Sequence, residues 1–356
     1  MADLEKIMGV SATDIEKIMG VSKDDIEKVM GVEIPASTPA WGGTRAVIMG
    51  GVGNGDDANE VSVTDYILYK TMASDSNTSQ FGQLIVDRDL AKGSGSNGSR
   101  IVIGGGRQAN GGATYLEDME YVTAASTGGG TDFGNLVDSA GQGGPDGASN
   151  GTLCFFNGGN DGNHNNDMEY VTIASTGNGT DAGNLQQAMG GHATSNGDSK
   201  YLIVGGFDGG IRDEVEQNNF STSANASDYG NVGTVASAHS GTACSTTRVV
   251  IAGGYVSAWV HGNNIHWFPV ASSADSTDAA DLHVAMKHVS GTSDGTRGEF
   301  YGGEESSYQV HNEIQKITIA SISGTATDVG DLTHPTYDSD YNDDGGLYAA
   351  SSQTGT

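Results

Sequence analysis

Aromatic, histidine and arginine side chains occur in five of the six stretches of the chain that each follow a pair of glycines. These candidate ligand-binding residues are Arg107, Tyr115, His164, Phe207, Tyr255, Trp259, His261 and Tyr308. Aromatic rings offer flat apolar surfaces on which a sugar ring stacks, and arginine and histidine hydrogen-bond its hydroxyl groups. If the fold brings the stretches to one face, they predict a carbohydrate-binding surface. Exposed aromatic side chains also occur singly without any function, so a plain surface is the alternative.

Aspartates recur just before a short hydrophobic element in five places, where a catalytic acid would be expected in one place only. We therefore expect them to accept hydrogen bonds from backbone N–H groups in turns. The five residues are Asp132, Asp181, Asp228, Asp278 and Asp328.

Histidines recur in the same way at His192, His239 and His288, eight or nine residues before Lys200, Arg248 and Arg297. Three convergent imidazoles would suit a metal ion. Repeated positions more often serve packing and hydrogen bonding between repeats, so we expect no metal site here.

The acidic run near the C-terminus contains Asp340, Asn342 and Asp344 at alternate positions, followed by Gly345. Oxygen ligands with this spacing begin many calcium loops, but Ser351 stands where the closing glutamate would be. Asp-Gly is also an ordinary hairpin turn, which is the structure that we expect; calcium is the alternative. The sequence carries no other cofactor signal and no catalytic signature, and we expect no enzyme.

The elements that must position these residues are repeats. Gly-Gly pairs end short β-type segments at six places, 47 to 55 residues apart, and a fixed period near 50 indicates an array. The pairs are Gly50-Gly51, Gly105-Gly106, Gly158-Gly159, Gly205-Gly206, Gly253-Gly254 and Gly302-Gly303.

Each repeat supplies four strands. A segment such as RIVIGGG is followed by a loop, by a strand such as DMEYVTAAST and by an element such as FGNL. Asn-Gly and Asp-Gly dipeptides then mark the turn that separates a fourth strand from the next repeat. Four antiparallel strands in about 50 residues are typical of a β-propeller blade. We predict an all-β fold, with a propeller of six blades over 44–356.

Near the C-terminus, the residues DGGLYAA (344–350) occupy the place of another turn and first strand. We expect this tail to close the ring with the first blade, because a propeller must protect its first and last strand edges. Seven blades are the alternative to six.

Residues 1–34 form a different repeat, of 11 residues: LEKIMGV, IEKIMGV and IEKVMGV. Ser-x-x-Asp starts and glycine stops predict three short helices. Their apolar residues are the docking candidates Ile7, Met8, Ile18, Met19, Val29 and Met30. Such short helices need a partner surface, either one another and the main domain or another protein. Residues 35–43 contain two prolines and are predicted to be a linker.

Charge narrows the choice of partners. The chain has 45 acidic against 16 basic residues and a formal net charge of -29, which repels nucleic acids and anionic membranes. No apolar run is long enough to span a bilayer, and the charged N-terminus does not resemble a signal peptide. Cys154 and Cys244 lie in or beside strand segments of different repeats, so we expect two core thiols rather than a disulfide.

The Gly-Gly strand ends, the loops and the strands that follow resemble the kelch-like, galactose-oxidase-type β-propeller. The segments DMEYVTIASTGNGTDAGNL and NEIQKITIASISGTATDVGDL are similar in sequence to repeats in structural proteins of tailed bacteriophages, particularly marine phages and cyanophages. The N-terminal repeats with DIEKIMGV resemble the leader segments of such virion proteins. The kelch tryptophan is absent: Phe133-Gly134 and Ala182-Gly183 stand at that point. The kelch resemblance is therefore one of architecture.

This resemblance implies a virion structural protein, located in the particle, of the tail-fibre or adhesin kind. The N-terminal helices would attach it to other virion proteins, and the propeller would face outward, where a host-surface glycan is the expected ligand. A passive capsid or tail decoration and a glycan-active propeller enzyme are the alternatives. A homo-oligomer is compatible with the sequence, whereas nucleic-acid binding and membrane insertion are not expected.

Overall fold

The computed structural model describes part of the chain. The described residues are 6–7, 10–11, 17–18, 21–22, 28–29, 32–33, 45–54, 61–89, 93–108, 114–137, 146–160, 163–191, 193–196, 199–232, 240–257, 260–305, 310–333 and 350–353. The chain divides into two compact units, Met1–Ala40 and Trp41–Thr356, which are described separately below. Among the described residues, no helix combines the length and the apolar character that crossing a membrane requires.

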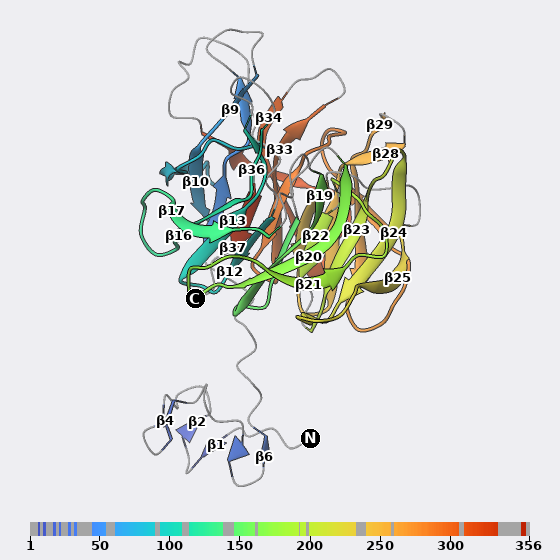
Figure 1. The fold of residues 1–356 in the computed structure, drawn as a ribbon. Helices are drawn as coiled ribbons and strands as arrows, with labels where there is room; N and C mark the ends of the chain where they lie inside the picture. The colour runs from blue at the N-terminus through green and yellow to red at the C-terminus, as the bar shows by residue number, and fades with distance from the viewer. Residues whose placement is uncertain are drawn as a thin grey trace. The chain divides into compact units, whose positions relative to one another are not determined.

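The larger unit is a six-bladed β-propeller of four-stranded antiparallel sheets (Figure 1). Blades 1 to 3, each from the innermost strand outward, are β37 (Ala350–Gln353), β7 (Arg45–Met49), β10 (Tyr66–Thr71), β11 (Ser79–Gln83); β12 (Gly93–Ser96), β13 (Arg100–Gly104), β16 (Asp118–Thr123), β17 (Thr131–Asn135); β18 (Asp146–Ser149), β19 (Leu153–Asn160), β20 (His164–Thr172), β21 (Thr180–Asn184).

Blades 4 to 6 follow the same order. They are β22 (Ala193–Asn196), β23 (Tyr201–Phe207), β24 (Ile211–Asn218), β25 (Ser227–Asn231); β26 (Gly241–Cys244), β27 (Arg248–Ala252), β30 (Asn264–Pro269), β31 (Thr277–Asp281); β32 (Ser290–Ser293), β33 (Arg297–Glu304), β34 (Val310–Thr318), β36 (Thr327–Asp331). The prediction of an all-β propeller with six blades is confirmed, and the alternative of seven is wrong.

Short elements complete the propeller. Two-stranded ribbons extend blades 1, 2 and 5: β8 (Val52–Asn54) with β9 (Val61–Val63), β14 (Arg107–Gln108) with β15 (Thr114–Tyr115), and β28 (Tyr255–Ser257) with β29 (Val260–His261). In blade 6, η3 (Ile319–Ser321) precedes β35 (Gly324–Thr325), which pairs in parallel with β31 of blade 5.

The six innermost strands contact one another in a closed ring: β37, β12, β18, β22, β26 and β32. Glycines make this close approach possible. A Cβ added at Gly147 would lie 2.2 Å from the backbone N of Ser94, and one added at Gly95 would lie 2.6 Å from Cys154 Sγ. Any larger residue would push adjacent blades apart.

The C-terminal strand closes the ring. β37 pairs antiparallel with β7, with Ala350 opposite Met49 and Gln353 opposite Ala46. The expectation that the two ends of the chain share a blade is confirmed, but the C-terminal tail does not have the role that the sequence predicted. The tail supplies the innermost strand of blade 1, not the first strand of another unit, because only that edge of β7 was left to pair.

Apolar side chains fill the seams between neighbouring blades. Val102, Phe133, Cys154 and Phe156 are fully or almost fully buried in one cluster between blades 2 and 3. Cys154 and Cys244 are both buried free thiols, as predicted.

The described residues of the smaller unit form three pairs of two-residue strands. They are β1 (Lys6–Ile7) with β2 (Val10–Ser11), β3 (Lys17–Ile18) with β4 (Val21–Ser22), and β5 (Lys28–Val29) with β6 (Val32–Glu33). The three predicted helices are not confirmed. In the sequence each strand pair is separated by Met-Gly, and glycine suits a two-residue hairpin as well as a helix end. Met8, Met19, Met30 and the linker 35–43 lie outside the described residues.

Candidate functional site

The stretches that follow the Gly-Gly pairs all lie at one end of the blades, which we call the hairpin face. Every glycine of the six pairs has a positive φ, between 54° and 125°, a backbone conformation that glycine adopts readily and other residues do not. At Gly50 a Cβ would lie 2.6 Å from the carbonyl oxygen of Arg88, so a side chain is excluded there for a second reason.

Segments that link one blade to the next cross this face and bind two blades together. Gly51 N donates to Arg88 O at 2.7 Å, and Gly254 N donates to Met286 O at 2.7 Å. The next residue of each linker forms a β-bridge with the residue after the following Gly-Gly pair: Asp89 with Arg107, Gly190 with Phe207, Lys287 with Glu304. In the described residues the hairpin face is thus built from blade pairs 1–2, 3–4 and 5–6.

In blade pair 1–2 the predicted residue Arg107 is held in an ion pair. Its Nε donates to Asp89 Oδ1 at 3.0 Å and its second nitrogen to Asp89 Oδ2 at 2.5 Å. This hydrogen bonding raises the pKa of Arg107. Tyr115 lies opposite Arg107 in the β14–β15 ribbon. Arg107 therefore already has a partner that fixes the linker to the blade.

In blade pair 5–6 Lys287 lies among Tyr255, His261 and Glu304. Lys287 Nζ is 3.1 Å from Glu304 Oε1 and 5.5 Å from the centroid of the Tyr255 ring. The ring centroids of Tyr255 and His261 are 5.2 Å apart. Burial and the nearby Lys287 charge lower the pKa of His261. Tyr255 is 8% exposed, so most of this aromatic surface is already covered.

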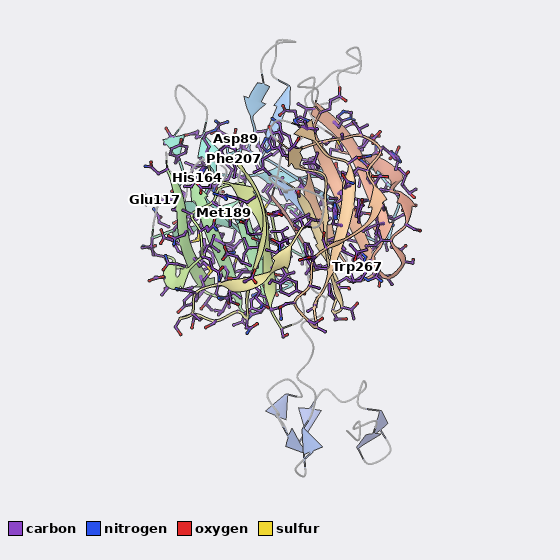
Figure 2. The ribbon with its side chains drawn as sticks, turned by 90° about the vertical axis from the view of Figure 1, so that its right-hand side faces the viewer. Asp89, Glu117, His164, Met189, Phe207 and Trp267 are labelled. Atoms are coloured by element: carbon purple, nitrogen blue, oxygen red, sulfur yellow. The ribbon has the colours of Figure 1, made fainter. Side chains whose placement is uncertain are left out.

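In blade pair 3–4 four side chains form what we call the 3–4 cluster: His164, Phe207, Asp208 and Arg212. The rings of His164 and Phe207 meet edge to face at 5.8 Å. His164 Nδ1 lies 3.9 Å from Asp208 Oδ1, and Arg212 donates to Asp208 Oδ2 at 3.1 Å. Figure 2 shows His164 and Phe207 near Met189, well away from Trp267.

The structure brings His164 together with Phe207, Tyr255 with His261, and Arg107 with Tyr115. These three groups belong to blade pairs 3–4, 5–6 and 1–2, respectively. Trp259 and Tyr308 lie outside the described residues. The ligand-binding role of all eight residues stays a prediction.

Sequence reasoning missed the charged residues of this face: Asp89, Asp208, Arg212, Lys287 and Glu304. Asp208 and Arg212 flank Gly-Gly in the stretch FDGGIR, so a hairpin could have suggested their pairing. Asp89 and Lys287 lie in the linkers between blades, and no pattern in the sequence indicated that these linkers cross the face.

Two of the recurring aspartates accept hydrogen bonds from backbone N–H groups in turns, as expected. Asp181 Oδ1 accepts from Gly183 N at 2.8 Å, and Asp328 Oδ1 accepts from Gly330 N at 3.0 Å. Of the three recurring histidines only His288 is described. No group of three or more His, Cys, Asp or Glu side chains suited to a metal ion occurs in the described residues. Asp340, Asn342 and Asp344 lie outside them.

In blades 2, 3, 4 and 6 a buried polar side chain of the third strand binds the segment that follows the outermost strand of the preceding blade. Glu120 accepts from Ile85 N at 2.7 Å, Glu169 from Val137 N at 2.7 Å and Glu216 from Gln186 N at 2.9 Å. Gln315 does the same for His283 N in blade 6. These acids look catalytic by burial alone, but their repetition and their partners make them structural.

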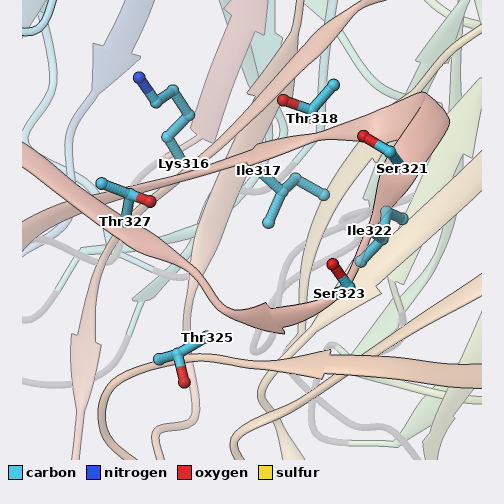
Figure 3. Close-up of a pocket in the computed structure, with 8 residues that line it drawn as sticks. All are labelled: Lys316, Ile317, Thr318, Ser321, Ile322, Ser323, Thr325 and Thr327. Atoms are coloured by element: carbon cyan, nitrogen blue, oxygen red, sulfur yellow. The ribbon is translucent and has the colours of Figure 1, made fainter.

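A hollow of about 170 Å³ lies in blade 6, away from the hairpin face (Figure 3). Its lining consists of serine and threonine residues together with Ile317, Ile322 and Lys316, and Lys316 Nζ donates to Asp75 Oδ1 at 3.0 Å. It presents no aromatic ring and no catalytic constellation.

No model of a known protein family matches the chain, and no curated protein is significantly similar to it. Its classification therefore rests on its architecture, an all-β propeller of six four-stranded blades.

Proposed function

We propose that this chain is a structural protein of a phage virion, of the tail-fibre or adhesin kind, whose hairpin face recognises a glycan on the host surface. In this proposal the N-terminal repeats attach the chain to the particle. The virion assignment rests on the resemblance of the repeats DMEYVTIAST and DIEKIMGV to those of tailed-phage structural proteins.

One observation supports recognition above all: the differences in sequence between the blades are concentrated on the hairpin face. The blades share their strands and their Gly-Gly pairs, and four of them share a buried acceptor in the third strand, whereas the stretches beyond the glycines differ in length and in side chains. Loops on a rigid scaffold are where binding surfaces are commonly built. Aromatic, histidine and charged side chains therefore lie together at one end of the propeller.

The topology suits a chain attached at one side and exposed at the other. β7 begins at Arg45, at the end of blade 1 opposite Gly50, and β37 ends at Gln353 beside Ala46 at that same end. The first and last described residues of the propeller thus lie at the end remote from the hairpin face.

Two measurements test the proposal. Mass spectrometry of purified particles is expected to detect the chain, and the purified chain is expected to compete with particles for adsorption to host cells. Its absence from particles would contradict the virion role. Presence without competition would instead identify a passive decoration, and release of shortened glycan from the cell surface would identify an enzyme.

A further inference from the structure

We propose that the hollow in blade 6 is a binding site for one small uncharged polyol, such as a single sugar ring. Its lining includes five hydroxyl residues, Thr318, Ser321, Ser323, Thr325 and Thr327 (Figure 3). This blade-6 hollow lies away from the hairpin face, so the inference goes beyond the recognition proposed there and does not depend on it.

The blade-6 hollow coincides with a departure from the other blades in the segment between the third and fourth strands. In blade 6 this segment comprises residues 319–326, eight residues, whereas in blades 2 and 3 it comprises seven, 124–130 and 173–179. It contains η3 and β35, and β35 pairs in parallel with β31, so the returning chain is held against blade 5. The hollow lies between this chain and the end of β34, and Figure 3 shows Ile317 pointing between the two.

The hydroxyl groups of the blade-6 hollow are available to a ligand. All five residues are exposed, and within the described part of the chain none of these hydroxyl groups hydrogen-bonds another protein group. In the corresponding segment of blade 1 the hydroxyl groups are used internally. There Ser74 Oγ donates to Thr71 O at 2.9 Å, and Thr78 Oγ1 lies 3.2 Å from Thr333 Oγ1. The hydroxyl groups that serve the fold in blade 1 are thus free for a ligand in blade 6.

A polyol matches this lining in chemistry and in size. Each serine or threonine hydroxyl donates one hydrogen bond and accepts others, which is also the hydrogen-bonding capacity of a sugar hydroxyl. Ile317, which is 7% exposed, and the partly buried Ile322 give the C–H groups of such a ligand an apolar surface. The volume of about 170 Å³ is below the roughly 300–1,000 Å³ of sites for drug-sized molecules, so it suits one ring and not a chain of several.

The charges around the blade-6 hollow favour an uncharged ligand. Lys316 Nζ donates to both carboxylate oxygens of Asp75, at 3.0 and 3.1 Å, and Arg297 Nη1 lies 2.7 Å from the same carboxylate. An anionic ligand would have to displace Asp75 and approach a chain with a formal net charge of -29. The eight lining residues include no aspartate or glutamate, so they offer a cation no carboxylate ligand.

Ligand-observed NMR of the full chain with glycerol, glucose, galactose, mannose and glucuronate tests this inference. Because the lining has no aromatic ring, binding rests on hydrogen bonds, and we expect a dissociation constant in the millimolar range for at least one of the four neutral compounds and no binding of glucuronate. Thr318→Val and Thr325→Val each remove one hydroxyl group at nearly constant shape and are expected to weaken binding about fivefold. Thr123→Val is the matched control, because Thr123 is exposed and occupies in blade 2 the position that Thr318 has in blade 6.

The outcomes decide the assignment. Weaker binding by both valine variants of the hollow, with an unchanged control, supports it. Neutral-polyol binding that survives both substitutions would overturn the placement in the blade-6 hollow, and binding of glucuronate alone would overturn the selection for an uncharged ligand. No binding of any neutral compound at about 100 mM would refute the site. Recognition by the hairpin face is tested separately by the adsorption experiment, so either proposal can fail without the other. Circular dichroism of each variant confirms that its fold is retained.

Discussion

At the scale of single residues, one position of the third strand carries a buried polar side chain in five of the six blades, whereas blade 1 has Leu68 there. Four blades place a glutamate or glutamine there, and each accepts a hydrogen bond from the tail of the preceding blade. Blade 5 has His266, which is 5% exposed and hydrogen-bonds Ser276 at 3.0 Å. Because the site is buried, a neutral imidazole is favoured over a charged one.

His266 therefore predicts a pH dependence. Burial lowers its pKa below the ordinary value of 6.5, so between 6.5 and the lower folded value the unfolded chain binds more protons. Stability should fall as the pH drops below about 6.5, and His266→Gln should reduce this fall. Urea unfolding of both proteins between pH 7.5 and pH 5 measures the difference, in which other titrating groups cancel. Identical pH profiles would contradict the prediction.

Glu120 combines the same structural bond with a charge. Besides Ile85 N it binds the guanidinium of Arg88 at 2.5 Å, and the Arg88 side chain is fully buried. Glu120→Ala would leave that cation without a counter-charge, at a cost of about 3–5 kcal/mol.

The equivalent neutral residue provides the comparison. Gln315→Ala removes an acceptor from His283 N and strands no charge, which should cost about 1–3 kcal/mol. Chemical denaturation of both variants tests the contrast. Equal losses would show that the Arg88 charge contributes nothing beyond the hydrogen bond.

At the scale of elements, β37 is the strand on which closure depends. Deleting residues 350–356 removes every pairing residue of this strand and leaves the inner edge of β7 without its ladder. Four paired residues at about 0.5–1.5 kcal/mol per hydrogen bond give an expected loss of roughly 2–6 kcal/mol. An exposed edge also invites aggregation.

Deleting residues 354–356 alone is the control, because these residues follow the strand. Thermal unfolding and light scattering should separate the two truncations. If both behave like the full chain, β37 does not stabilise the closed ring.

The strands and loops also show which parts of the fold can be predicted from the sequence. The strands and the blade count were predictable, because alternating apolar residues and a Gly-Gly pair recur with one period. The face that carries Phe207 and His164 was predictable for the same reason. The bridges from Asp89, Gly190 and Lys287 were not, because backbone hydrogen bonds leave no pattern in side chains. Met-Gly steps in residues 1–34 fit a helix end and a hairpin equally well.

At the scale of the whole molecule, the seam between blades 6 and 1 carries a network of charges. Glu299 is completely buried and binds Lys70 Nζ at 2.9 Å, the guanidinium of Arg297 and the hydroxyl of Tyr301 at 2.8 Å. Burial lowers the pKa of Lys70 although Glu299 opposes this shift. The two blades that come from opposite ends of the chain are thus joined by ion pairs as well as by apolar packing.

Breaking this network should weaken the ring at its closing seam. Glu299→Ala leaves Lys70 buried without its partner and should cost about 3 kcal/mol or more. Adding Lys70→Met removes the stranded ammonium and should recover part of that loss. Denaturant unfolding of the single and double variants measures both effects. A double variant less stable than Glu299→Ala would contradict an electrostatic role for the pair.

The pairing of β37 with β7 has one more consequence. In blade 2 the innermost strand and its neighbour are joined by a four-residue turn, from Asn97 to Arg100, with Ser96 opposite Ile101. In blade 1 the corresponding residues Gln353 and Ala46 lie opposite one another with no such turn between them. The propeller is therefore a circular permutation of a continuous repeat, opened at one hairpin. Rejoining Gln353 to Ala46 through an Asn-Gly turn, with new termini at another such turn, should give the same ring.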